Sequence, residues 1–191
     1  TVPIGDKKVS LSVKEVVAKS TNYDAIDYKV TKYIFEPGIK KVEIDGYHNS
    51  SVKSVIFEGD NTQVDIYFNG NYPLEEVKLP ANITQLEEYS SFANCKTLKS
   101  VILPEKLEEI PASLFEGCSA LTTLVIPNTV TKIGKNAFKE SGLTQITLPE
   151  SLTTIEASAF YKTKLETITI PKNVTKIPTD CFYQCENLIR A

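Results

Sequence analysis

Apolar and polar residues follow one another along this chain in an order that repeats every 22 to 24 residues. The stretch 121–142 shows this order: an alternating apolar run, a proline, a second short apolar run and an Ala-Phe pair. Full copies begin at Leu74, Leu98, Leu121, Leu143 and Leu165, and a truncated sixth copy begins at Leu188. A fixed period in the twenties is typical of solenoids, in which each repeat forms one coil of a stack.

Two other residues keep their places in every full copy. A proline lies six residues after each leading leucine, at Pro80, Pro104, Pro127, Pro149 and Pro171. A phenylalanine follows that proline by eleven residues, or by twelve in the first copy, at Phe92, Phe115, Phe138, Phe160 and Phe182. We therefore predict that every copy folds into the same kind of coil.

The copy that begins at Leu121 indicates how a coil is built. Because side chains alternate along a strand, Leu124 and Ile126 should face the interior while Thr123 and Val125 face solvent. The following proline cannot donate a ladder hydrogen bond, so it ends the strand. The pair at 137–138 is expected to begin a short helical turn whose Phe ring fills the space behind the sheet. The pattern predicts a right-handed α/β solenoid with one parallel sheet of at least five strands, one per full repeat.

The first 38 residues do not fit the repeat. The spacing of Ser12 and Glu15 matches a capping box, which predicts a short helix over 13–19. Alternation over 28–35 predicts a strand, and the Glu-Pro-Gly sequence at 36–38 predicts a turn.

These differences suggest a division of the chain. We expect residues 1–38 to form an N-terminal cap over the open end of the stack, because an uncovered terminal coil exposes a sheet edge and the core. Residues 39–191 should form the solenoid, with degenerate repeats over 39–73 and regular repeats of 22–24 residues over 74–191.

Charge and composition narrow the range of functions. The net charge of −3 argues against a nucleic-acid partner, which normally requires a basic face. Residues 75–116 carry eight acids and four lysines, whereas residues 127–178 carry seven lysines and four acids, so charge is unevenly distributed. No apolar run is long enough to span a membrane. Because the sequence lacks Met and begins in polar residues, we expect a mature or trimmed piece of a longer, exported protein.

Residues capable of chemistry are few. Three cysteines lie three residues after a repeat Phe, at Cys95, Cys118 and Cys185, and Cys181 replaces the Ala before Phe182. They are interpreted as buried small hydrophobes, with a disulfide between stacked cysteines as the alternative. The only histidine, His48, is expected to lie in a turn, and no zinc-ligand spacing occurs. We therefore expect no catalytic residues, no metal and no cofactor.

The shared pattern, L-x-x-[LIV]-x-[IL]-P-x-x-[LV]-x-x-I-x-x-x-[AC]-F-x-x-C, resembles the BspA-like class of leucine-rich repeats. The resemblance covers roughly residues 74–191 well and 39–73 poorly. It implies a leucine-rich-repeat solenoid with a right-handed parallel sheet. It also implies a bacterial surface or secreted protein, since the class occurs mostly there and in some eukaryotic parasites. Members are associated with adhesion, including binding to extracellular host proteins.

Outward-facing strand positions supply the candidate binding site. One row comprises Glu76, Ser100, Thr123, Gln145 and Thr167, and the next comprises Lys78, Ile102, Val125, Thr147 and Thr169. Thr and Val also suit exposed strands by propensity alone, so the rows are open to a purely structural interpretation. The functional interpretation is a monomeric adhesion module that binds an extracellular or host protein through this face. The alternatives are a structural spacer and a glycan-binding module.

Overall fold

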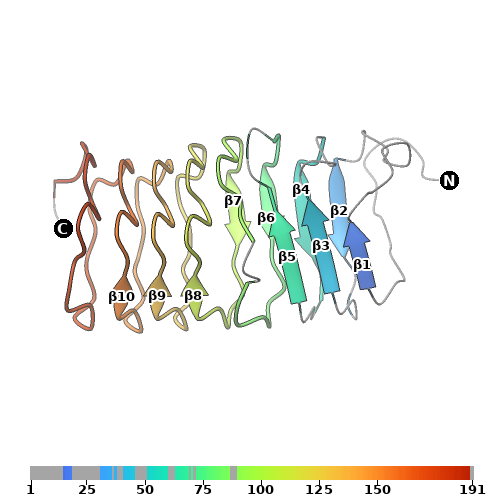
Figure 1. The fold of residues 1–191 in the computed structure, drawn as a ribbon, viewed down its shortest axis with the longest axis horizontal. Coiled ribbons are helices and arrows are strands. Elements are labelled where there is room, and N and C mark those ends of the chain that lie inside the picture. The colour runs from blue at the N-terminus through green and yellow to red at the C-terminus, as the bar shows by residue number, and fades with distance from the viewer. Residues whose placement is uncertain are drawn as a thin grey trace.

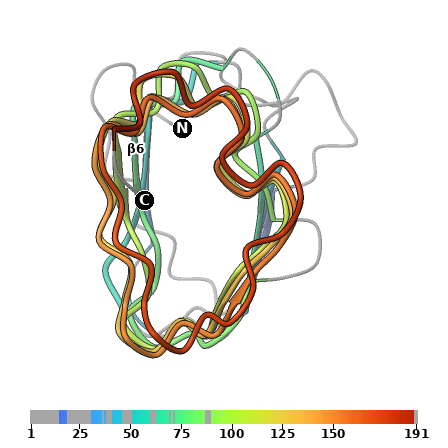
Figure 2. The same cartoon turned by 90° about the vertical axis from the view of Figure 1, so that its left-hand side faces the viewer.

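The computed structural model describes residues 15–18, 31–35, 37, 41–45, 51–59, 63–68, 70, 72–86 and 90–189. These residues form an elongated stack of coils, with β1 (Glu15–Ala18) near one end and the coils that follow β10 (Thr154–Ile155) at the other (Figure 1). Viewed along the stack, the coils superpose as an elongated ring (Figure 2). The solenoid predicted from the repeat is confirmed.

All paired strands are parallel, and they form three sheets among the described residues. The four-stranded sheet comprises β2 (Lys32–Phe35), β4 (Ser54–Phe57), β6 (Glu76–Lys78) and β7 (Ser100–Ile102), in that order. A second sheet comprises β1, β3 (Lys41–Asp45) and β5 (Gln63–Tyr67). The third comprises β8 (Glu109–Ile110), β9 (Lys132–Ile133) and β10.

Strands of the first two sheets alternate along the chain from β1 to β6, so each coil passes through both. We call the surface of β2, β4, β6, β7 and the segments 123–125, 145–147 and 167–169 the leading side. The strands of the other two sheets form the return side, across the core from β6 (Figure 2). Because a coil carries strands on both sides, the core is enclosed between two β surfaces.

The predicted register of the leading side is correct. In the copy that begins at Leu121, the side chains of Leu124 and Ile126 are buried, whereas Val125 is 85% exposed and Thr123 is also exposed. Alternation with period two therefore determines which residues reach the core.

The strands differ in number from the prediction. Among the full repeats, only β6 and β7 pair as leading-side strands, and farther along the leading side an isolated parallel bridge links Val125 and Thr147. The return side contains strands that the sequence analysis did not predict. There Gly134 donates its backbone N–H to the Ile110 carbonyl at 2.8 Å, and Glu156 donates likewise to Ile133 at 2.9 Å.

A proline explains why this return-side sheet ends at β10 within the described residues. Pro178 occupies the place in its coil that Gly134 and Glu156 occupy in theirs. Proline has no backbone N–H, so Pro178 cannot donate the corresponding ladder hydrogen bond to Ile155.

The expected helical turn at Ala137–Phe138 is absent, and no described residue is helical. The residue two positions before the repeat Phe has a positive φ in four coils, at Ser113, Asn136, Ser158 and Asp180. Residues two after it have positive φ in five coils, at Asn94, Gly117, Glu140, Lys162 and Gln184. A helix needs consecutive right-handed residues, so this alternation breaks it into separate turns.

Hydrogen bonds show what replaces the helix at this corner. The N–H of Lys139 bonds within its own coil, to the Asn136 carbonyl at 3.0 Å. Its neighbours Phe138 and Glu140 instead donate to the next coil, at 2.9 and 2.8 Å. Alternate amides therefore stabilise the turn and the stack in succession, which a helix could not do.

The N-terminal expectations are corrected in part. The helix predicted over 13–19 is wrong, because Glu15–Ala18 is strand β1, paired in parallel with β3. Of the strand expected over 28–35, Lys32–Phe35 is present as β2, residues 28–30 lie outside the described residues, and Pro37 lies in a turn. Since β2 pairs with β4 on the leading side, the sheet already begins before residue 39. The division of the chain at residue 38 remains a proposal.

Stacked phenylalanines fill the interior behind the strands. The rings of Phe92, Phe115, Phe138, Phe160 and Phe182 form a ladder with centroid separations of 5.8, 5.7, 5.4 and 5.5 Å. The first four of these side chains are fully buried. Burial of one such ring contributes roughly 1.5–3 kcal/mol, so the ladder is a major part of what holds neighbouring coils together.

Candidate interaction surface

Pairing of β6 with β7 brings the first members of the two predicted rows together. Glu76 lies beside Ser100, and Lys78 lies beside Ile102. Eight of the ten predicted residues are exposed, and the other two, Glu76 and Lys78, are partly exposed. The rows therefore lie on one accessible surface, while their role in binding stays a prediction.

The apolar part of this surface is concentrated in the second row. Ile102 is 52% exposed and Val125 is 85% exposed, and the two residues occupy the same position in consecutive repeats. Both line a hollow of about 500 Å³, together with Glu105 and Pro127. A contact on these two side chains would bury apolar area that now faces water.

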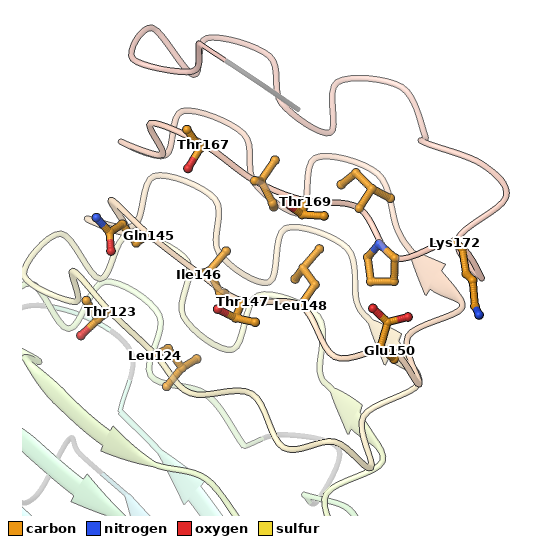
Figure 3. A pocket seen from close by; sticks show the side chains of 13 residues that line it. Thr123, Leu124, Gln145, Ile146, Thr147, Leu148, Glu150, Thr167, Thr169 and Lys172 are labelled. Carbon is orange, nitrogen blue, oxygen red and sulfur yellow. The ribbon is translucent and has the colours of Figure 1, made fainter.

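A longer groove of about 640 Å³ continues along the leading side (Figure 3). Figure 3 shows Thr123, Gln145 and Thr167 along one edge of it, from three successive coils, with Glu150 and Lys172 at the opposite edge. Buried and partly buried aliphatic side chains lie between these edges, at Leu124, Ile146, Leu148, Ile168 and Ile170. The groove combines an apolar floor with hydroxyl and amide edges.

Glu150 and Lys172 are groove residues that the sequence analysis missed. Each directly follows a repeat proline, as do Glu105 and Asn128, which line the apolar hollow. The sequence offered a signal for them, because the residue directly after the repeat proline differs from copy to copy while the proline itself is always present. It was overlooked because strand alternation says nothing about residues beyond the end of the strand.

Some charged residues on the two sides of the solenoid pair with one another. At the first repeats, Glu75 bonds Lys99 at 3.2 Å and Lys53 at 3.4 Å, which holds the pKa of this carboxyl below its ordinary value. On the return side, Lys132 lies between Glu109 at 2.9 Å and Glu156 at 3.0 Å, and these partners raise its pKa. The Thr- and Gln-rich part of the leading side is uncharged by comparison.

The four cysteines are free, so the disulfide alternative is not realised. Three of them are buried, and the thiols of Cys95 and Cys118 donate to the carbonyls of Phe68 and Phe92 in the preceding coil, at 3.3 and 3.1 Å. Burial raises the pKa of Cys95 to about 12 and raises that of Cys118 further. These thiols serve as packing groups and inter-coil donors, because nucleophilic chemistry would require a lowered pKa.

Other chemistry finds little support in the described residues. No three His, Cys, Asp or Glu side chains gather there in a group that could hold a metal ion. His48 lies outside the described residues. Within the part of the chain that is described, no helix has the length and apolar character needed to cross a membrane.

The repeat order, the parallel coils and the Phe ladder all characterise one family. The model of the BspA type leucine rich repeat region matches residues 65–189 in six copies. The chain belongs to the BspA-type leucine-rich repeat family. The match begins in β5 and includes Phe68, whose N–H donates to the Ser91 carbonyl as Phe115 donates to Ala137. Phe68 therefore occupies the backbone position of the repeat Phe in the degenerate coil, and the sequence analysis missed it; its ring packs against Tyr72 at 5.9 Å.

Solved structures of bacterial leucine-rich repeat proteins share the architecture. A leucine-rich repeat protein from T. pallidum is 25% identical, with a TM-score of 0.62 over 84% of this chain and 73% of that one. A leucine-rich repeat protein from Bacteroides ovatus is 26% identical, with a TM-score of 0.55 over 73% of this chain and 40% of that one. The pneumococcal vaccine antigen PcpA, at 21% identity and a TM-score of 0.61 over 95% and 54%, shares the fold alone. The chain spans less than two thirds of the length of the last two proteins. No curated protein matches it.

Proposed function

We propose that this chain is a non-catalytic protein-binding module of a secreted or cell-surface bacterial protein. In this proposal it binds an extracellular or host protein through the leading side. The observation that carries the proposal is the adjacent exposed pair Ile102 and Val125, set in a Thr- and Gln-rich surface. Membership of a repeat family whose solenoids present long continuous surfaces supports it.

The rigidity of the surface supports the same function. Beneath the leading side lie buried residues such as Leu124 and Leu148, and behind them the stacked Phe ladder. A partner that docks on such a surface has few long side chains to immobilise, which lowers the entropic cost of binding. The two rows contain no aromatic anchor, so we expect one module to bind its partner with modest affinity. Several copies on a cell surface would raise the apparent affinity by binding together.

The non-catalytic part of the proposal rests on the chemistry of the described residues. The buried thiols of Cys95 and Cys118 have raised pKa values, whereas a nucleophile needs a lowered one. Two acids of the return side, Glu109 and Glu156, share Lys132 on an open strand surface. Paired catalytic acids instead face each other across a bound substrate.

The test measures binding of the purified chain to a panel of purified extracellular matrix proteins by surface plasmon resonance. The double variant Ile102→Glu with Val125→Glu should remain folded, because both side chains face water, and should lose binding at least tenfold. The matched control, Thr154→Glu with Thr175→Glu, adds the same charge at two exposed positions outside the leading side and should bind like the parent.

Two outcomes would contradict the proposal. If the leading-side double variant binds as well as the parent, the contact lies elsewhere. If the parent shows no saturable binding to any protein of the panel, the structural spacer becomes the better explanation.

A further inference from the structure

One outward row of the leading side continues into the coils that precede the full repeats. On β4, Ile56 lies between the buried Val55 and Phe57, so its side chain faces outward, and it is partly exposed. The sheet register sets Ile56 beside Lys78 of β6, and it sets Lys78 beside Ile102 of β7. The row that the sequence analysis began at Lys78 therefore starts earlier in the chain.

Ile34 and Val125 extend this row in both directions. Ile34 of β2 pairs with Ile56 and is partly exposed, and Val125 occupies the position of Ile102 in the next repeat. Apart from Ile34, the members lie on coils that have a neighbouring coil on each side, so no chain end exposes them. We call these five residues the aliphatic row: Ile34, Ile56, Lys78, Ile102 and Val125.

Lys78 is the charged member of the aliphatic row. Its side chain is partly exposed and forms no ion pair within the part of the chain that is described. The other outward residue of β6, Glu76, accepts a hydrogen bond from the Ser54 hydroxyl at 3.1 Å. A cation without a partner between aliphatic side chains favours a ligand that brings a carboxylate flanked by apolar groups.

The strands beneath the aliphatic row cannot pair with a partner through their backbones. Within the four-stranded sheet, β6 lies between β4 and β7, and β4 lies between β2 and β6. Addition of a partner strand requires a free sheet edge. A partner that contacts the aliphatic row must therefore do so with its side chains.

The spacing of the coils favours a helix over an extended segment as that partner. Neighbouring strands lie about 4.8 Å apart, and the coils follow one another in a nearly straight stack (Figure 1). A helix laid along the stack advances about 5.4 Å per turn, so over the three steps from Ile56 to Val125 the two periods differ by only about 2 Å. In an extended segment, side chains on one face recur about every 6.8 Å and cannot meet every coil.

We propose that the aliphatic row binds an amphipathic helix of a partner protein, laid along the stack and across the strands. Apolar side chains one turn apart would pack on Ile56, Ile102 and Val125. A Glu or Asp in the same stripe would face Lys78, where the surrounding aliphatic groups exclude water and strengthen the contact. The recognised helix therefore carries one acid within its apolar stripe.

This inference rests on the proposed function, since it names the kind of protein segment that the leading side recognises, yet the two can fail separately. If the chain binds no matrix protein but binds a helical peptide through Lys78, the proposed extracellular partner is wrong and the helix-binding row stands. If binding to a matrix protein depends on Ile102 and Val125 but no helical peptide binds, only the helix is wrong.

The probe is a helical peptide of alanine and glutamine, titrated by calorimetry into the purified chain. One stripe of it carries leucine, glutamate, leucine and leucine, each one turn from the next. Of two control peptides, one has lysine in place of the glutamate, and the other has a proline that breaks the middle of the helix. We expect the glutamate peptide to bind saturably with a Kd on the order of 0.1–1 mM, and both controls to bind about fivefold more weakly or worse.

A charge exchange tests whether the acid faces Lys78. Lys78→Glu should weaken binding of the glutamate peptide about fivefold and strengthen binding of the lysine peptide by a similar factor, because the pair is restored with its signs reversed. Added salt should reduce both effects. Lys96→Glu makes the same charge change at an exposed position outside the leading side and should alter neither affinity.

A second variant tests the coil that the predicted rows omitted. Ile56→Thr removes apolar contact area and should weaken binding of the glutamate peptide about fivefold. Thr147 and Thr169 occupy the same row in later coils, so the fold accepts this residue there, and thermal unfolding should match that of the parent. If Ile56→Thr is destabilised, the charge exchange at the outward Lys78 still decides the question.

Three results would overturn the inference. The first is the absence of saturable binding of the glutamate peptide by the parent. The second is an unchanged preference between the glutamate and lysine peptides in Lys78→Glu, which would show that the acid does not face this residue. The third is equally tight binding of the proline-containing peptide, which would assign the aliphatic row to an extended segment.

Discussion

Truncation of Phe138 tests whether the Phe ladder holds the coils together. Its side chain is fully buried, and its ring stacks between Phe115 at 5.7 Å and Phe160 at 5.4 Å. Phe138→Ala should therefore lower the free energy of unfolding by about 3–5 kcal/mol, the usual cost of removing a buried ring and leaving a cavity. The two lost ring contacts, each worth about 0.5–1.5 kcal/mol, place the expected value toward the upper end of that range.

Phe182 provides the comparison for this variant. Its side chain is only partly buried, and its ring stacks on that of Phe160 at 5.5 Å in the last described coil. Phe182→Ala should therefore cost less, on the order of 1–2 kcal/mol for the smaller area lost. The difference between the two variants isolates the value of a place inside the ladder.

Urea unfolding followed by circular dichroism measures both losses. In a solenoid each coil contacts only its neighbours, so damage at Phe138 should also split the transition or lower its m-value, as the two halves unfold separately. Phe182→Ala should keep one transition with the parent slope. If Phe138→Ala costs no more than Phe182→Ala, the ladder is not the main connection between coils and the reasoning is wrong.

Three further predictions concern single side chains. Ser141 buries a hydroxyl that has no hydrogen-bond partner, so Ser141→Ala should leave stability unchanged or raise it by up to about 1 kcal/mol. The buried Thr163 hydroxyl donates to the Phe160 carbonyl at 3.0 Å, so Thr163→Ala should lower stability. Cys95 should resist a thiol reagent at pH 8 until urea unfolds the chain, since its pKa is about 12. Lys132 lowers the folded-state pKa of Glu156, so this pair stabilises the fold at neutral pH. The contribution is lost as the pH falls below about 4, where Glu156 becomes protonated. In Glu156→Gln the free energy of unfolding should therefore decrease less steeply as the pH is lowered.

The fold could be predicted from the sequence where one signal repeats in every coil. Leading leucines, prolines and phenylalanines recur at fixed offsets, and this determined the solenoid, the buried positions such as Leu124 and the stacked rings. A single copy would not have sufficed, because a short alternating run is ambiguous by itself. Repetition removes the ambiguity, since all copies must satisfy the same packing.

Where the prediction failed, a local signal competed with contacts between coils. The capping-box spacing of Ser12 and Glu15 favours a helix, yet pairing with β3 makes Glu15–Ala18 a strand. The turn around the repeat Phe is likewise determined by contacts between coils. Glu140 and Lys162 adopt left-handed backbone conformations for which their residue types show no preference, because alternate amides must reach the next coil. Neither feature could be read from the residues concerned.

The candidate site was predictable only in its exposure. Alternation placed Ile102 and Val125 outward, and the structure agrees. The grooves depend instead on a position that the repeat leaves free to vary, the residue directly after the proline. Residues at this position, such as Glu150 and Lys172, are exposed, so a change there from one coil to the next alters the surface without altering the fold. Stability and recognition in this solenoid therefore reside in different columns of the same repeat, and variants in outward columns should change binding while the unfolding transition stays that of the parent.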